Sequence, residues 1–545
     1  MVTNRKEFDS RRKKRIKRMN AANSIANGKI VLESDLVKFL ETIIHSKDIV
    51  VIEGDNQKQA STLGKAMAKL NPKIVNDLHL VISSLQQKEH LDLFELGIAS
   101  KLDFSYAGSS SPRLPKMIEE NTVKIGAIHT YLELYARLFT DLIPDICLIA
   151  ADEADIEGNL YTGNNTEDTP TIVEATAFKD GIVICQVNKI VDKVSRIDIP
   201  GEWVDYIVET KEPYYIDALF TRDPAKLKDV HVLMGMMAIK GVYAKHKVQR
   251  LNHGIGLNTV AIELLLPTYG EELGLKDTIC NNWVVNPLPT LIPAIESGWV
   301  KTIEAFGSEV GMENYVAARP DVFTLGRDGS LRSNRCISQL AGLYGIDMFV
   351  GSTLQMDQYG NASTVTNGRI TGFGGGPNMG SNPNGRRHCT KPWNSLRKNA
   401  DDPLSRGRKL IVLIVQTTSK SGPAFVEELD AVSVGKKAGF EEAPVMIYGD
   451  DVTHLVTEIG IGYVYLADNL EERKKIIAAV AGNTPVGRLI TPEEIEVLRK
   501  KGKVQYPEDL GINLSEATTD KLAAHNLHDL VDWSEGLYDI PEKFL

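Results

Sequence analysis

The sequence predicts an α/β protein: two related domains with open, mostly parallel sheets, followed by a mostly helical C-terminal part. Short β-branched runs alternate with helical patterns, as in DIVVIEGD before QASTLGKAMAKL, which is typical of strands joined by crossover helices. A D-x-x-G-N motif occurs twice, at residues 155–159 and 357–361, an offset of 202 positions. The turns at Gly54 and Gly254 repeat with an offset of 200. Two matches at nearly one offset predict a duplication.

The predicted boundaries follow from these repeats. A chain of 545 residues is too long for a single hydrophobic core. We predict a basic N-terminal segment at 1–19, a first domain at 20–232, a second domain at 233–435, and an α-rich extension at 436–545 that completes the second domain. Chance similarity between common turn patterns is the alternative to a duplication. The glycine turns of the two halves are expected to face each other across a cleft.

Charge and composition exclude several classes of protein. The net charge of -10 disfavours nucleic acid as a partner. The basic run RRKKRIKR at 11–18 is instead expected to form a solvated or subunit-docking helix. The longest apolar run, LIVLIV at 410–415, is too short to span a membrane, so no membrane partner is expected. Five cysteines without a C-x-x-C motif argue against a metal site or a disulfide framework and fit a cytoplasmic protein.

The most informative segment is TGFGGGPNMGSNPNGRRH at 371–388, which follows a strand-like run. Its glycines remove side chains that would hold a ligand away, and their N–H groups are free to bind phosphate, carboxylate or thioester oxygen. A plain tight connection is the alternative. A second glycine turn, NHGIGLNT at 252–259, suggests a facing loop. The predicted oxyanion or thioester donors are Gly254, Gly256, Gly375, Gly376 and the Asn378 amide.

Two such loops suit a ligand with a phosphate-bearing arm and a reactive acyl end, as in coenzyme A. Arginine forks bind carboxylates through two hydrogen bonds, which suggests a small dicarboxylate as the second ligand. The residues expected to bind substrate are Arg250, Asn252, His253, Gly374 and Arg386, with Arg387 and His388 close by. For Arg386 and Arg387, ordinary surface charge is the alternative. Hydrolase-elbow, zinc-protease and Walker A motifs are absent from the sequence.

Beyond these features, NHGIGLNTVAIELLLPTY, the paired D-x-x-G-N motifs and RITGFGGGPNMG resemble the coenzyme A-transferase superfamily. More specifically, GAIHTYLELYARLFTDL, GNLYTGNNTEDTPTIVEATAFK, AFGSEVGMENY and the C-terminal LVDWSEGLYDIPEKF are similar to the alpha subunits of bacterial malonate decarboxylases. This resemblance extends over nearly the whole chain.

The resemblance implies an acyl-carrier-protein (ACP) transferase that exchanges acetate for malonate on a carrier thioester. It implies no tightly bound cofactor, because the reacting thiol belongs to a phosphoribosyl-dephospho-coenzyme A group on the carrier. The implied partners are the carrier (delta) subunit, the beta and gamma decarboxylase subunits, malonate and acetate. A citrate lyase alpha subunit, a coenzyme A-transferase for another acid, and a non-catalytic scaffold subunit are the alternatives.

One departure from the superfamily bears on mechanism. Coenzyme A-transferases carry a glutamate nucleophile on the strand after the glycine-turn helix, whereas residues 278–295 contain no carboxylate here. We therefore expect malonate itself to attack the acetyl thioester and form a mixed anhydride, without a glutamyl intermediate at Glu53, Glu263 or Glu309.

Overall fold

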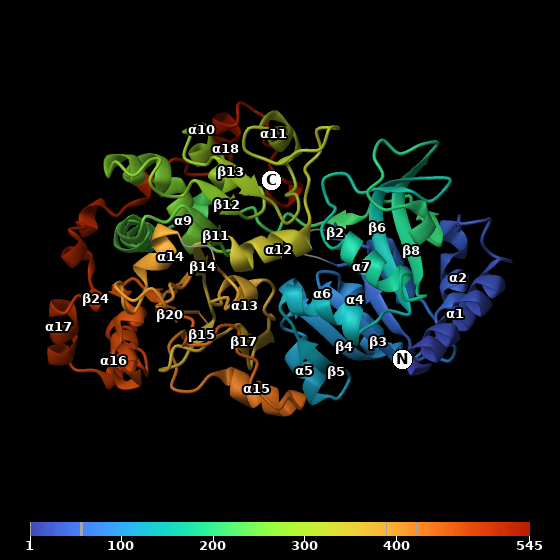
Figure 1. Ribbon diagram of the computed structural model, residues 1–545, viewed down its shortest axis with the longest axis horizontal. Coiled ribbons are helices and arrows are strands. Elements are labelled where there is room, and N and C mark those ends of the chain that lie inside the picture. The colour runs from blue at the N-terminus through green and yellow to red at the C-terminus, as the bar shows by residue number, and fades with distance from the viewer. Residues whose placement is uncertain (1, 55–57, 388–389, 421) are drawn as a thin grey trace.

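The computed structural model describes residues 2–54, 58–387, 390–420 and 422–545. Two eight-stranded sheets form its two halves, which lie side by side with helix α12 (Arg335–Tyr344) near their junction (Figure 1). Both sheets are mostly parallel and covered by helices, which confirms the predicted fold class. None of the described helices is long and apolar enough to cross a membrane. The domain boundaries stay predictions.

The first sheet has the strand order β5-β4-β3-β1-β6-β8-β9, with β7 antiparallel beside β6. All other neighbours in this sheet are parallel. Its strands are β1 (Ile49–Ile52), β3 (Leu78–Ser84), β4 (Ala99–Tyr106), β5 (Lys124–Ile128), β6 (Ile146–Asp155), β7 (Leu160–Tyr161), β8 (Ile182–Val191) and β9 (Tyr206–Glu209).

Helices cover both faces of the first sheet because the buried strands are apolar on both sides. Val50 and Ile52 of β1 belong to one hydrophobic cluster, while Val51 belongs to another on the opposite face. The helices of this half are α1 (Val2–Ala22), α2 (Leu36–Ile43), α3 (Ser61–Met67), α4 (Lys88–Glu95), α5 (Leu114–Glu119), α6 (Tyr131–Thr140) and α7 (Thr169–Ala177).

The second sheet has the order β13-β12-β11-β14-β19-β22-β23-β24. Its strands are parallel up to β22, and β23 and β24 are added antiparallel. The strands are β11 (Arg250–His253), β12 (Asn282–Val284), β13 (Thr302–Glu304), β14 (Met348–Gly351), β19 (Leu410–Ile414), β22 (His454–Val456), β23 (Ile461–Gly462) and β24 (Val504–Gln505). In both halves the first strand is central, the next strands extend to one side, and the chain then returns to the other side.

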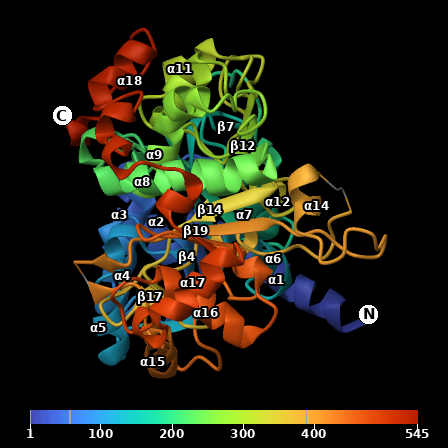
Figure 2. The same cartoon turned by 90° about the vertical axis from the view of Figure 1, so that its left-hand side faces the viewer.

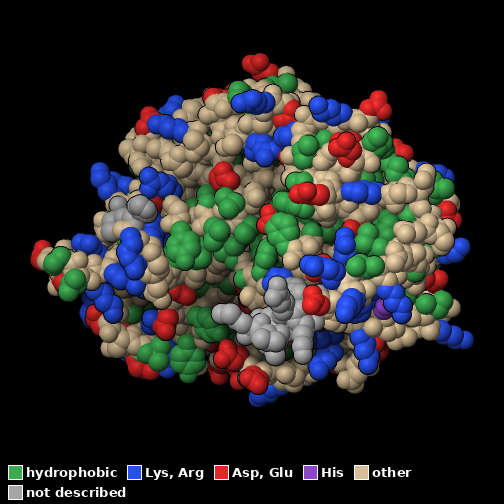
Figure 3. Space-filling model, turned by 45° about the vertical axis from the view of Figure 1, so that its right-hand side comes forward, with side chains coloured by type: hydrophobic (Ala, Val, Ile, Leu, Met, Phe, Trp, Pro, Cys, Tyr) green, Lys and Arg blue, Asp and Glu red, His purple; other side chains and the backbone are tan. Residues whose placement is uncertain are grey.

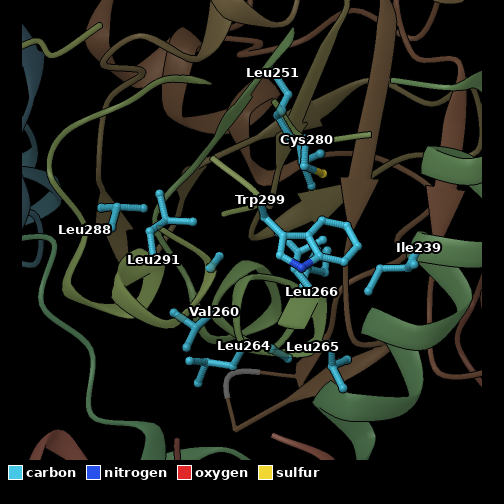
Figure 4. Packing of buried hydrophobic residues seen from close by; sticks show 14 of the residues in the cluster. Ile239, Leu251, Val260, Leu264, Leu265, Leu266, Cys280, Leu288, Leu291 and Trp299 are labelled. Carbon is cyan, nitrogen blue, oxygen red and sulfur yellow. The ribbon is translucent and has the colours of Figure 1, made fainter. Parts of the chain in front are cut away.

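The core of the second half packs around the buried indole of Trp299, with Leu251 of β11 and Leu266 near it (Figure 4). The helices of this half are α8 (Asp229–Ala238), α9 (Leu257–Leu265), α10 (Ile292–Glu296), α11 (Glu313–Ala318), α12, α13 (Gly376–Met379), α14 (Lys391–Ser395), α15 (Asp430–Ala438), α16 (Leu470–Val480), α17 (Pro492–Lys500) and α18 (Leu527–Trp533). Four two-stranded ribbons complete the fold: β2 (Lys58–Gln59) with β10 (Tyr215–Ile216), β15 (Gln355–Met356) with β16 (Ala362–Ser363), β17 (Val365–Thr366) with β18 (Arg369–Ile370), and β20 (Thr418–Ser419) with β21 (Gly422–Pro423).

The two D-x-x-G-N motifs form the same turn. The Asp155 carboxylate accepts the backbone N–H of Asn159 at 3.0 Å, and Asp357 accepts that of Asn361 at 2.9 Å. In both copies the asparagine amide donates to the other carboxylate oxygen at 2.9 Å. The intervening glycines have φ values of +93° and +92°, a conformation that favours glycine. The aspartates therefore stabilise matching turns after β6 and β14.

The basic run at 11–18 forms part of α1, and its arginines contact carboxylates of this same chain. Arg18 is buried and pairs with Asp48 at 2.7 Å, while Arg11 pairs with Asp145 at 3.2 Å. Arg15 forms a further ion pair with Asp205. This side of α1 therefore docks on the first half, although the start of the helix extends away from the body of the protein (Figure 2).

Candidate active site

The main candidate site is a cavity of about 390 Å³ at the carboxyl ends of β11 and β14. These neighbouring strands mark the point where the second sheet changes the direction of its connections, which is where open α/β sheets bind ligands. The cavity is lined by residues 252–255 at the end of β11, residues 351–354 at the end of β14, and residues 373–376 of the glycine-rich loop. The structure thus brings both predicted loops together around one cavity. The first half contributes Tyr106, Tyr131, Phe220 and Arg222.

The glycine-rich loop is held against the end of β4 in the first half. The carbonyl of Ser105 accepts the N–H groups of Phe373 at 2.6 Å and Gly374 at 2.9 Å, and Ala107 donates to Thr371 at 2.8 Å. Gly372 has φ +78°, and a Cβ there would lie 2.4 Å from the Ser105 carbonyl oxygen. This close approach requires glycine.

Some N–H groups of the two loops donate hydrogen bonds within the protein, and others are left available for a ligand. Gly254 donates to Val350 at 2.7 Å, and Gly376 donates to Phe373 at 3.0 Å. Gly374 donates to Ser105, so the N–H groups of three of the predicted glycines are already used in hydrogen bonds. Within the described part of the chain, the N–H groups of Ile255, Gly256 and Gly375 have no acceptor.

The N-terminus of α9 supplies a favourable field beside these donors. Its first turn leaves N–H groups without helical partners, and the helix dipole places partial positive charge there. The Thr259 hydroxyl lies 2.9 Å from the carbonyls of both Gly254 and Gly256. It therefore fixes the turn that carries the N–H groups of Ile255, which lines the main cavity, and Gly256, which lines the adjoining recess. Anionic oxygen is stabilised in such a position.

Asn252 and His253 line the cavity mainly through their backbone. The Asn252 amide donates to the Val284 carbonyl at 2.5 Å. The His253 ring is buried between Glu263, 2.8 Å from Nδ1, and the Tyr243 hydroxyl, 2.8 Å from Nε2. Burial raises the pKa of Tyr243 well above its usual value. These contacts fix the turn after β11.

The Asn378 amide lies behind the cavity wall and is not among its lining residues. It donates to Gln339 at 2.6 Å, and its oxygen accepts the Thr130 hydroxyl. Gln339 itself lines the cavity, and a Cβ on Gly375 would lie 2.9 Å from its side-chain oxygen. Asn378 therefore positions Gln339 against the glycine loop.

The two arginines expected to bind substrate lie outside the cavity. Arg250 is exposed at the amino end of β11, whereas the cavity opens at the carboxyl end. Arg386 is buried in a pair with Asp347 at 2.9 Å and lies 4.3 Å from the Trp393 ring. Arg387 is exposed, and His388 lies outside the described residues. Strand direction and burial, which the local sequence does not reveal, account for these placements.

Three other arginines line the cavity: Arg222, Arg335 and Arg369. Arg335 is buried and paired with Glu167. Arg222 is half-buried, and Arg369 is exposed on β18. No local sequence pattern indicates these three arginines, because they come from three segments that only the fold brings together.

Among the described residues, no aspartate or glutamate lines the main cavity. Glu53 and Glu309 are buried elsewhere, whereas the buried Glu263 lines a small recess that shares residues 253–255 with the main cavity. Glu263 accepts the Thr290 hydroxyl and contacts His253, while Glu309 accepts the N–H groups of residues 220 and 221 at 3.1 and 2.7 Å. No group of three metal-ligating side chains occurs in the described ranges.

At the corresponding position of the first half, a carboxylate takes the place of the glycine. Strand register places Ile52 opposite Leu148 in β6 and His253 opposite Val350 in β14, so Glu53 is the counterpart of Gly254. The Glu53 carboxylate accepts the N–H of Ala150 at 2.7 Å and lies 3.3 Å from the Lys58 ammonium.

This register corrects the sequence alignment, which matched Gly254 to Gly54. It also corrects the prediction that the glycine turns of the two halves face each other across a cleft, because no described residue of the Gly54 turn lines the cavity. The N-terminus of α3, which corresponds to α9, is covered. Gln186 of β8 accepts the N–H groups of Thr62 at 2.9 Å and Leu63 at 3.1 Å.

Paired doubly wound sheets with a glycine-lined cavity between their loops are the features of the coenzyme A-transferase fold. The fold is shared with an acyl-CoA transferase from Escherichia coli O157:H7, at 15% identity and a TM-score of 0.52 over 80% of this chain and 88% of that one.

The chain belongs to the malonate decarboxylase alpha-subunit family: residues 7–545 match the family described as "Malonate decarboxylase, alpha subunit, transporter". It is 53% identical to an acetyl-S-ACP:malonate ACP transferase from Malonomonas rubra, over 97% of both chains. It also matches a chain in the crystal structure of a Pseudomonas malonate decarboxylase hetero-tetramer in complex with malonate, with 55% identity, a TM-score of 0.97 and 98% coverage of both chains.

Proposed function

We propose that this chain transfers an acyl carrier protein from acetate to malonate, converting acetyl-S-ACP and malonate into malonyl-S-ACP and acetate. The observation that carries the proposal is a cavity that combines outward N–H groups and cationic side chains with no lining carboxylate among the described residues. The relative from Malonomonas rubra, 53% identical over 97% of both chains, bears the name of this activity.

In the first step, a malonate carboxylate oxygen attacks the acetyl carbonyl carbon. A C–O bond forms and the C–S bond breaks, so the carrier leaves as a thiolate and an acetyl-malonyl anhydride remains. The thiolate then attacks the malonyl carbonyl carbon, so that a new C–S bond forms and acetate departs with one oxygen from malonate. Thiol and carrier are unchanged, and no external nucleophile is needed.

Both steps pass through a tetrahedral oxyanion. The N–H group of Ile255 at the start of α9 stabilises it, with the Gly375 N–H on the opposite loop. Gly256, which lines the adjoining recess, supplies a further N–H group beside Ile255. Donors of this kind contribute about 3 kcal/mol each to transition-state stabilisation. Because these donors are backbone groups held by Thr259 and Ser105, they are already oriented before the substrate binds.

The lack of a lining carboxylate favours the anhydride route over an enzyme-bound glutamyl intermediate. The Glu263 carboxylate contacts His253 and accepts the Thr290 hydroxyl, and Glu53 is buried beside Lys58 in the first half. Either one would have to leave a buried hydrogen-bonded position to attack a thioester in the main cavity, and such a position is costly to vacate.

The thioester substrate is proposed to be carried on a phosphoribosyl-dephospho-coenzyme A group of the carrier. This group is part of the substrate. The exposed Arg369 lies at the cavity wall on the β17–β18 ribbon, where an arginine suits a phosphate-bearing arm. The reactive end would then reach the glycine loops inside.

The proposed partners are a carrier (delta) subunit and beta and gamma decarboxylase subunits. Helix α12 has a surface that suits contact with a partner subunit. Its Ser338 and Gln339 side chains are buried, whereas Ile337 and Tyr344 are 56% and 46% exposed. Figure 3 shows further hydrophobic side chains in patches on one face of the molecule. Apolar patches on a protein surface mark interaction sites when they are contiguous.

Exchange of labelled malonate onto acetyl-carrier by the purified chain tests the function. Rapid acetate release with one label incorporated per carrier is expected, and citrate or butyrate should be poor acceptors. A chain that exchanges no acid while still binding its partner subunits would be a scaffold instead.

Oxygen-18 labelling tests the mechanism separately. With malonate labelled in its carboxylates, the released acetate should contain oxygen-18. Trapping of a glutamyl adduct by hydroxylamine at Glu53, Glu263 or Glu309 would contradict the anhydride route without contradicting the transferase activity.

A further inference from the structure

Arg222 is a cation that protrudes into the cavity without a carboxylate partner. Its Nη1 donates to the carbonyl oxygens of Leu219 at 2.6 Å and Thr221 at 2.8 Å. No acidic side chain in the described ranges lies within ion-pair distance of its guanidinium. An arginine presents five N–H donors, so the two backbone contacts leave other donors available for a ligand.

The backbone that carries Arg222 is fixed. The buried Glu309 carboxylate accepts the N–H of Phe220 at 3.1 Å, the N–H of Thr221 at 2.7 Å and the Thr221 hydroxyl at 2.8 Å. Since the two residues before Arg222 are held in this way, its guanidinium is presented from a rigid segment. A preorganised arginine loses little entropy when it binds a ligand.

The position of Arg222 connects it with the reacting groups. It lines the main cavity and also a small recess that contains Ile255, Gly256 and Thr259 at the start of α9. The Glu263 carboxylate also lines this recess, where it contacts His253 and accepts the Thr290 hydroxyl. Burial lowers the pKa of Arg222, because water is partly excluded from the guanidinium, yet an arginine stays protonated in proteins. A partly desolvated cation beside the oxyanion donors attracts an anion strongly.

A short dicarboxylate fits this arrangement. One carboxylate must reach the thioester near the glycine loops, while the other needs a fixed cation a few ångströms away. Arg369 is less suited to this task because it is exposed, and solvent screens exposed charges. Arg335 is already paired with Glu167.

Resting on the proposed transferase function, we infer that Arg222 binds the carboxylate of malonate that takes no part in acyl transfer. The guanidinium forms charge-assisted hydrogen bonds to that carboxylate, and the other carboxylate is directed toward the acetyl carbonyl. Arg222 then decides specificity: it distinguishes malonate from monocarboxylic acids such as acetate, which lack the distal group.

The test compares malonate with monomethyl malonate, in which the distal carboxylate is masked as an ester. Exchange of each acid onto acetyl-carrier is measured for the wild type and for Arg222→Gln, together with exchange of labelled acetate. Arg222→Gln should raise the KM for malonate about ten-fold or more, since charge-assisted pairs are strong. It should change the KM values for monomethyl malonate and acetate by less than about two-fold.

Two further variants sharpen the comparison. Arg250→Gln makes the same change of charge at an exposed position outside the cavity, and it should leave all three KM values unchanged. Arg222→Lys keeps the charge but loses the planar fork, so it should restore only part of the preference for malonate. Thermal unfolding of each variant shows whether the chain remains folded.

The outcomes separate the inference from the function on which it rests. Equal losses with all three acids in a folded Arg222→Gln variant would mean that Arg222 acts on the thioester or the reacting carboxylate, and would overturn the inference. Unchanged malonate kinetics would overturn it too. If the wild type exchanges no acid, the proposed function fails; calorimetric binding of malonate that is weakened in Arg222→Gln but not in Arg250→Gln would then still support the site.

Discussion

Arg335 of α12 and Glu167, two residues before α7, form an ion pair in which the side chains are 1% and 0% exposed. The Arg335 N–H also donates to the Glu167 carbonyl at 3.0 Å, and its guanidinium lies 5.2 Å from the Tyr131 ring centroid. The pair therefore connects the two halves of the chain at the wall of the cavity.

Glu167→Gln should lower the free energy of unfolding by about 3–5 kcal/mol, because it removes the charge of one partner from a buried ion pair. Denaturant unfolding of the variant measures this loss. Glu157→Gln, at an exposed glutamate that forms no ion pair within the described part of the chain, is the control and should change stability by less than about 0.5 kcal/mol. Similar losses in both variants would contradict the prediction.

Gly375→Val should abolish acid exchange while Gly256→Ala leaves the chain stable. A Cβ at Gly375 would lie 2.9 Å from Gln339, whereas a Cβ at Gly256 would meet no atom within 4 Å. Gly256 has φ 165°, an extended conformation that alanine adopts. Exchange rates and melting temperatures of the two variants provide the measurement, and normal exchange by Gly375→Val would be evidence against the role of that loop.

Acid should destabilise the protein through a buried histidine pair. Nε2 of His246 lies 3.0 Å from Nε2 of His454, and burial lowers the pKa of His246 to about 4 and that of His454 well below its usual value. In the unfolded chain both protonate near their ordinary pKa of about 6.5. The unfolded state then binds more protons, so stability falls as the pH drops through 6.5.

Unfolding free energies at pH 7.5 and pH 5 for the wild type and His246→Gln measure this effect. The wild type should lose more stability than the variant over this interval, because the variant has one fewer buried histidine to protonate. An equal loss in both proteins would show that other groups control acid stability.

Gln186→Leu should destabilise the first half without affecting the exchange reaction. Its side-chain oxygen accepts two N–H groups at the start of α3, and removing a helix cap costs about 1–2 kcal/mol. Lys189→Gln, at an exposed position of the same strand, is the matched control. A change in the KM for malonate in folded Gln186→Leu would contradict the separation of this helix start from the active cavity.

The sequence predicted the fold and the two loops because both depend on local patterns. Alternating strand and helix segments and the repeated D-x-x-G-N turn are readable along the chain, and the turns at residues 155–159 and 357–361 have matching hydrogen bonds. Gly256 and Gly375 were found by the glycine pattern, and their N–H groups are unoccupied in the described structure.

The cationic residues were harder to predict because proximity in sequence differs from proximity in space. Arg250 and Arg386 flank the glycine loops, but strand direction carries the first to the opposite end of the sheet and the second is buried beside Asp347. Arg222 is separated from both loops in the sequence and reaches the cavity only through the packing of the two halves. The roles assigned to individual site residues stay predictions.

At matching positions, the first sheet has Glu53 and the second sheet has Gly254. This difference bears on how many malonate molecules one chain binds. In the first half this position holds a carboxylate paired with an ammonium group, whereas in the second half it has no side chain. We therefore expect the first half to support the structure and the second half to bind the reacting acid. One chain should accordingly saturate with a single malonate, and exchanging the two halves would not regenerate the enzyme.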